Sequence, residues 1–68
     1  MEQLKDKIKE LRIQKGWTLK ELSSKSGVSY PVLIGIEKGT YANASDLTIG
    51  KIANALDYDF RELLKLRG

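Results

Sequence analysis

The sequence predicts an all-α fold, a compact bundle of five short helices in a single domain that spans residues 1–68. Apolar residues recur at spacings of three and four along nearly the whole chain, which is the periodicity of amphipathic helices. Glycines and helix-capping residues separate these stretches, and there is neither an internal repeat nor a low-complexity linker. A chain of 68 residues is near the lower size limit for a domain that folds unaided.

The composition excludes several classes of protein. The chain has no Cys and no His, so zinc fingers, thiol enzymes and His-based active sites are excluded, and we expect neither a metal nor a cofactor. No segment approaches the ~20 apolar residues of a membrane span, and residues 1–14 lack the apolar core of a signal peptide. We therefore expect a soluble, cytoplasmic domain. A net charge of +3 favours a polyanionic partner only slightly.

The first two helices are predicted from an apolar stripe and a capping motif. A helix over residues 4–15 is expected to end at Gly16. Its stripe consists of Leu4, Ile8 and Leu11. The second helix begins at Thr18, whose hydroxyl caps the first turn while Glu21 reaches back, in a T-x-x-E capping box. It is expected to end by Gly27.

The third helix is predicted to have Ser29 as its N-cap and Pro31 in its first turn, where a missing N–H costs nothing. It is expected to run to Lys38, because Gly39 follows as a stop signal.

The last two helices are predicted from further caps. The fourth is capped by Ser45 or Asp46, and the fifth begins at Asp59, which is expected to form a second capping box with Glu62. The fourth helix is expected to direct four side chains to the core: Ile49, Ile52, Ala53 and Leu56.

Residues 18–38 carry the pattern with a functional meaning. Two short helices joined by a tight turn that contains glycine predict a helix-turn-helix, a motif that offers its second helix to the major groove of DNA. Gly27 permits the positive φ that the turn needs, and Ser23 is small where the helices cross. The angle between the helices is expected to be buried by Leu22, Val28, Leu33 and Ile36.

From Leu4 to Leu64 the chain resembles the phage-repressor-like helix-turn-helix family, of the Cro and λ-repressor type. The matching stretches are IKELRIQKGWTLKELSSKSGVS, IEKG and KIANALDYDFRELL. The resemblance implies a single-domain bacterial or phage-encoded regulator, associated with the nucleoid. Such a protein binds an inverted-repeat operator in double-stranded DNA as a homodimer, acts as a repressor, and places its third helix in the major groove. It also implies an ion pair between Arg12 and Glu37.

The same resemblance indicates where DNA is expected to bind. The expected DNA-binding residues are Thr18, Leu19, Lys20, Ser29, Tyr30, Pro31, Val32, Gly35, Lys38, Thr40, Tyr41 and Asn43. The N–H groups at the starts of the second and third helices are natural sites for phosphate. The dimer interface is expected at the C-terminal apolar residues Tyr58, Phe60, Leu64 and Leu66, because the first four helices can be buried without all of them. No enzyme and no small-molecule ligand are expected, because no nucleophile is paired with a base and no phosphate-binding Gly loop occurs.

The third helix departs from the family pattern, because its outer positions carry no amide or guanidinium for reading bases. Three interpretations remain open. In the first, apolar contacts of Tyr30, Val32 or Ile34 with thymine methyl groups, aided by DNA shape, provide specificity. In the second, the apolar face binds a protein partner, which makes the chain a protein-interaction module. In the third, some of these side chains belong to the core. Gly35 stands in mid-helix, where glycine is less favourable than alanine. Either DNA or a partner approaches the backbone closely at this position, or the loss of helix stability is simply tolerated.

Overall fold

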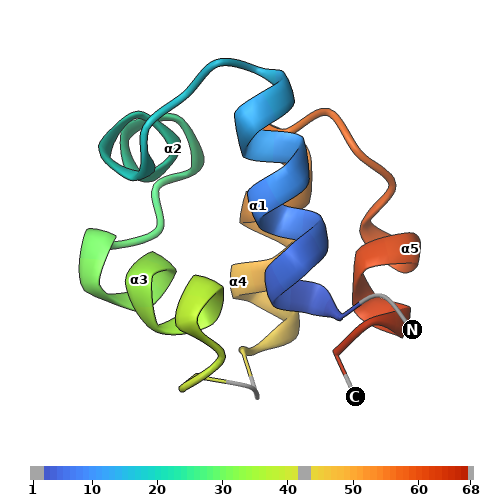
Figure 1. Ribbon diagram of the computed structural model, residues 1–68. Helices are drawn as coiled ribbons and strands as arrows, with labels where there is room; N and C mark the ends of the chain where they lie inside the picture. Colours follow the sequence, from blue (N-terminus) through green and yellow to red (C-terminus); the bar gives the residue numbers. More distant parts are fainter. Residues whose placement is uncertain (1–2, 42–43, 68) are drawn as a thin grey trace.

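The computed structural model describes residues 3–41 and 44–67, which form five helices and no strand (Figure 1). The helices are α1 (Leu4–Gln14), α2 (Leu19–Ser26), α3 (Tyr30–Lys38), α4 (Asp46–Ala55) and α5 (Phe60–Lys65). The predicted all-α bundle of five helices is confirmed, and the helix boundaries agree closely with those expected. Among the described residues, no helix has the length and apolar character needed to cross a membrane.

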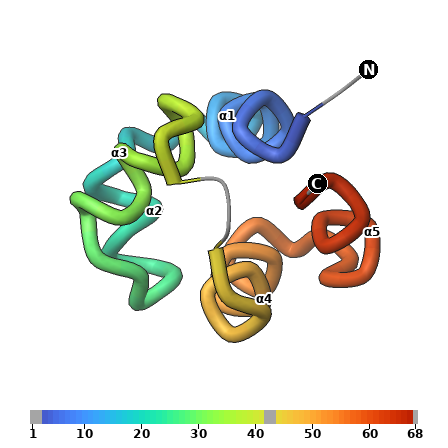
Figure 2. The backbone as a smooth tube through the Cα atoms, turned by 90° about the horizontal axis from the view of Figure 1, so that it is seen from below, coloured from blue at the N-terminus to red at the C-terminus, as the bar shows by residue number. Residues whose placement is uncertain are grey.

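The helices surround one apolar core. Seen from below, α2 and α3 lie together on one side of the bundle and α5 on the other, with α1 and α4 between them (Figure 2). All five helices or their flanking turns contribute to the core, which consists of Leu4, Ile8, Leu22, Val28, Leu33, Ile36, Ala44, Ile49, Ile52, Ala53, Leu56 and Leu63. The four core positions predicted for the fourth helix are therefore confirmed as buried, with Leu56 standing just after the last residue of α4. Removing this apolar area from water is the main force that holds such short helices together.

The caps of α2 and α4 follow the prediction. The Thr18 hydroxyl accepts from the Glu21 amide at 3.1 Å, and the Glu21 carboxylate accepts from the Thr18 amide at 2.9 Å, so both halves of the capping box are present. At α4 the cap is Ser45, whose hydroxyl accepts from the Thr48 amide at 3.2 Å. These contacts satisfy amides that the first turn of a helix leaves unpaired.

Ser29 occupies the N-cap position of α3, as predicted, but within the described chain its side chain makes no capping hydrogen bond. Pro31 is the second residue of α3 and has no N–H, so one of the two amides that a cap normally reaches is missing.

The second capping box, between Asp59 and Glu62, is also absent from the described residues. Asp59 Oδ1 accepts from the Arg61 amide at 2.8 Å instead. The Glu62 carboxylate accepts from Lys65 Nζ at 3.1 Å, because a lysine three residues further along a helix lies within its reach.

The turn between α2 and α3 fixes the angle of the helix-turn-helix. Gly27 has φ = +77°, as predicted, and its amide donates to the Ser23 carbonyl at 2.9 Å. Ser23 was predicted only as a small residue, yet its hydroxyl also donates to the Val28 carbonyl at 2.7 Å. The Ser26 hydroxyl accepts from the Val28 amide at 3.2 Å. Hydrogen bonds thus hold the start of α3 against the end of α2.

Replacing Gly27 by Ala is expected to lower the free energy of unfolding by about 1–2 kcal/mol, the cost of a Cβ in the left-handed region. A Cβ here would meet nothing within 4 Å, so the loss reports backbone conformation alone. Gly27→Asn is the matched control, because Asn tolerates positive φ, and it should lose less. Urea unfolding measures both variants, and equal losses would contradict the assigned turn conformation.

Candidate nucleic-acid interface

An ion pair joins α1 to the last turn of α3. Arg12 Nε donates to Glu37 Oε2 at 2.8 Å and Nη2 donates to Oε1 at 3.1 Å, which is the two-pronged geometry of a guanidinium and a carboxylate. The remaining nitrogen, Nη1, donates to the Trp17 carbonyl at 2.7 Å. The side chains of Arg12 and Glu37 are 13% and 7% exposed. One guanidinium therefore ties together α1, the connection to α2, and α3.

This environment raises the pKa of Arg12. The hydrogen bond to Glu37 is the largest cause and the attraction of the two charges adds to it, whereas burial acts in the opposite direction. A cation with a raised pKa in the folded state stabilises the fold fully below its ordinary pKa. This stabilisation is lost only when the pH rises through the pKa of Arg12 in the folded state. Charged Arg12 therefore stabilises the fold fully throughout the neutral pH range.

The face of α3 opposite the core forms a row of accessible residues. Tyr30, Pro31 and Lys38 are exposed, and Ile34 and Gly35 between them are half-buried. These five positions follow the three- and four-residue spacing of one helix side. We call them the α3 outer row. The structure thus brings together four predicted DNA-binding residues, Tyr30, Pro31, Gly35 and Lys38, on a single surface.

The other predicted DNA-binding residues differ in their exposure to solvent. Thr18, Lys20, Ser29, Thr40 and Tyr41 are exposed. Leu19 and Val32 are half-buried and pack against the core, which favours the core interpretation for these two side chains. Tyr30 is 39% exposed and is available for contact. Asn43 lies outside the described residues.

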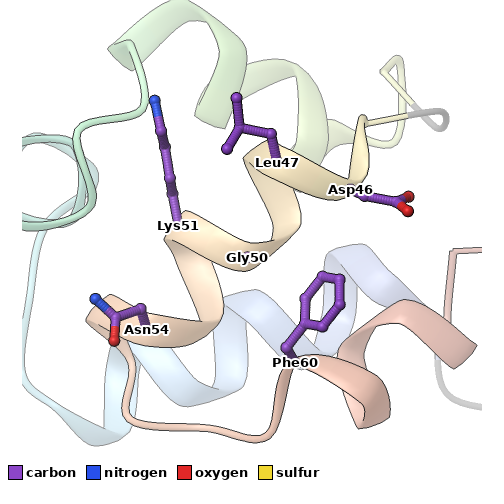
Figure 3. A pocket seen from close by; sticks show the side chains of 6 residues that line it. All are labelled: Asp46, Leu47, Gly50, Lys51, Asn54 and Phe60. Carbon is purple, nitrogen blue, oxygen red and sulfur yellow. The ribbon is translucent and has the colours of Figure 1, made fainter.

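The residues predicted to form the dimer interface also differ in their exposure to solvent. Tyr58, Leu64 and Leu66 are half-buried and pack against the core of their own chain, whereas Phe60 is 36% exposed. Phe60 borders a shallow hollow of about 340 Å³ between α4 and α5. The hollow is lined by Asp46, Leu47, Gly50, Lys51, Asn54 and Phe60 (Figure 3).

Leu47 was missed by the sequence analysis, although it is 69% exposed on the rim of this hollow. In Figure 3, Gly50 lies between Leu47 and the ring of Phe60. The signal available in the sequence was an apolar residue off the core stripe of the fourth helix. A large apolar side chain on the polar side of an amphipathic helix indicates a contact surface.

The geometry defines a helix-turn-helix protein: two short helices with a fixed turn, the second of which presents one free side. The chain belongs to the helix-turn-helix family, whose sequence pattern matches residues 8–63. The resemblance to phage-repressor-like regulators is therefore confirmed.

Two transcriptional regulators named SinR, from Bacillus subtilis (strain 168) and Bacillus licheniformis, are each 36% identical to the chain over 58 residues. The match covers 85% of this chain and 52% of each regulator, so the chain spans about half the length of these curated relatives. A crystal structure of SinR, described as the master regulator for biofilm formation, in complex with DNA has the same fold. It gives a TM-score of 0.85 and 34% identity, and covers 90% of this chain and 97% of that one.

Replacing Arg12 by Met is expected to lower the free energy of unfolding by about 3 kcal/mol, because it leaves the Glu37 carboxylate buried without its partner. The double variant Arg12→Met/Glu37→Met should lose less than the sum of the two single changes, since neither charge then remains alone. Lys65→Met is the control, because it breaks the exposed pair with Glu62 and should cost under about 1 kcal/mol. Denaturant unfolding of the four variants measures this, and strictly additive losses would contradict a coupled pair.

Proposed function

We propose that the protein is a sequence-specific transcriptional regulator that binds double-stranded DNA with α3 in the major groove. The observation that carries this proposal is the α3 outer row, which contains no buried residue, while the opposite side of α3 holds Leu33 and Ile36 fully inside. A related protein of the same fold, SinR, has been crystallised with DNA, which supports the same use of the fold here.

Phosphate groups on either side of the groove are the expected partners of the polar residues around α3. Lys20 and Lys38 are exposed cations, and Thr18 and Ser29 stand at the N-caps of α2 and α3, where the positive end of the helix dipole attracts anions. Phosphate contacts of this kind supply affinity and register but no base preference. Tyr30, Pro31 and Ile34 then determine the base preference, through apolar contacts with thymine methyl groups and through DNA shape.

A protein-binding module is the second candidate function. It is favoured by the lack of any amide or guanidinium on the α3 outer row, where Tyr30 and Ile34 are the larger side chains. The two functions differ in their dependence on salt, because only binding to a polyanion releases many counterions.

Affinity for random duplex DNA should fall linearly on a log-log plot against salt concentration, with a slope near −0.9 per phosphate contacted. Lys20→Ala and Lys38→Ala should each make the slope shallower by about 0.9. Lys65→Ala on α5 is the matched control and should leave the slope unchanged. Absence of binding by the folded protein at low salt would contradict DNA binding and favour the protein-binding module.

Homodimer formation, an inverted-repeat operator and repression complete the proposal. A single domain of this size contacts too few base pairs to find one operator among ~10⁶ competing sites, whereas a two-fold dimer reads two half-sites about 34 Å apart. Repression follows if the dimer occupies an operator and blocks access to it. Exposed Phe60 and Leu47 support a dimer interface on the hollow between α4 and α5.

Phe60→Asp should convert the dimer to a monomer in analytical ultracentrifugation, because it places a charge at the centre of the apolar surface. Sequences selected by the wild-type protein from a random DNA pool should be inverted repeats, whereas those selected by the variant should be single half-sites. Ile13→Asp is the control, because Ile13 is equally apolar and 58% exposed, but lies on α1. A dimer that persists in Phe60→Asp would exclude this interface.

A further inference from the structure

Gly35 requires an explanation, because a glycine inside a helix is less favourable than an alanine. Backbone conformation does not provide one. The described glycines with positive φ are Gly16, Gly27 and Gly39, and Gly35 is not among them. Its helical backbone would accept any side chain, so the reason must be the space beside it.

That space is occupied by the chain itself. A Cβ on Gly35 would stand 3.1 Å from Tyr41 Cβ and 3.5 Å from Thr40 Oγ1, and the first distance is shorter than an ordinary van der Waals contact. The Gly35 carbonyl accepts hydrogen bonds from the Thr40 amide at 2.9 Å, the Tyr41 amide at 3.1 Å and the Thr40 hydroxyl at 3.2 Å. After Gly39 the chain thus folds back against the last turns of α3, in the manner of a glycine-based helix stop.

The position of this contact matters because Gly35 belongs to the α3 outer row. Pro31 lies four residues before it and Lys38 three residues after it on the same side of the helix. Tyr41 therefore covers the one place in the row that has no side chain of its own. Tyr41 remains 40% exposed beside the surface that the proposed function assigns to DNA.

We propose that Gly35 is a positioning residue that seats Tyr41 on the outer face of α3, where the Tyr41 hydroxyl donates a hydrogen bond to a phosphate oxygen of bound DNA. This inference rests on the proposed function. A phosphate is favoured over a base edge because Tyr41 follows the end of α3 and lies beyond the helical positions that enter the groove. Tyrosine hydroxyls are among the donors that bind the DNA backbone.

Tyr41→Phe tests the hydroxyl, because it keeps the Cβ that lies against Gly35 and removes only the O–H. Affinity should fall roughly three- to ten-fold for both operator and random duplexes, which corresponds to one hydrogen bond. The slope of affinity against salt should not change, since the hydroxyl carries no charge. An altered base preference would overturn the phosphate assignment, and unchanged affinity would overturn the contact itself.

Gly35→Ala tests the positioning role. Its melting temperature should be equal to or above that of the wild type, because alanine favours the helix. The Tyr41 amide should nevertheless exchange its hydrogen faster, and affinity for DNA should fall as far as in Tyr41→Ala. The double variant Gly35→Ala/Tyr41→Ala should show no further loss, because the two residues act through one contact.

Ser24→Ala is the control, because it also raises helix propensity at an exposed position, on α2. It should leave both amide exchange at Tyr41 and DNA affinity unchanged. If Gly35→Ala keeps its protection and its affinity, or if it does not fold, the positioning role is wrong, and Tyr41→Phe then decides the hydroxyl contact separately. If the wild-type protein binds no DNA, the proposed function itself is overturned. If the wild type binds DNA and Tyr41→Phe binds it equally well, only the hydroxyl contact is overturned.

Discussion

The ion pair between Arg12 and Glu37 is the interaction on which the placement of α3 depends. It bridges residues 25 positions apart, and the third hydrogen bond of Arg12, to the Trp17 carbonyl, fixes the connection that leads into α2. Since both side chains are nearly buried, each requires the other, because an unpaired charge in this position is costly. The start of α3 is held separately, by the Gly27 turn and by the hydrogen bond from Ser23 to Val28. A helix fixed at both ends presents its outer row in one orientation.

The chemistry of that row explains the kind of recognition we propose. Its side chains have few polar atoms near the middle of α3, so the pairs of donors and acceptors that identify a base edge are scarce. The row itself ends in the exposed cation Lys38, and Lys20 on α2 is a second exposed cation. This division suits a protein that gains affinity from the DNA backbone and discriminates among sequences by apolar contact and shape. Tyr41 adds a polar group to the row without taking up a helical position.

Local signals in the sequence predicted most of the fold, because helix starts and stops are set by neighbours in the chain. The Thr18–Glu21 capping box and the Gly27 turn are examples. The Ser29 side chain lacks its capping bond and the Asp59–Glu62 box is absent where a proline or a competing lysine changed the available partners. The pair of Arg12 and Glu37 was expected from family resemblance alone, since local spacing says nothing about residues so far apart. The contact of Gly35 with Tyr41 and the burial of Tyr58, Leu64 and Leu66 depend on tertiary packing, which an apolar pattern does not specify.

We propose that the outer side of α3 is the surface that meets the DNA duplex. Titration of the ¹⁵N-labelled protein with duplex DNA, followed by NMR, tests it directly, because each backbone amide reports its own surroundings. The largest shifts are expected at the amides of the α3 outer row other than Pro31, which has no N–H, and at the first amides of α2. Binding that leaves α3 unshifted and perturbs only the hollow between α4 and α5 would contradict it.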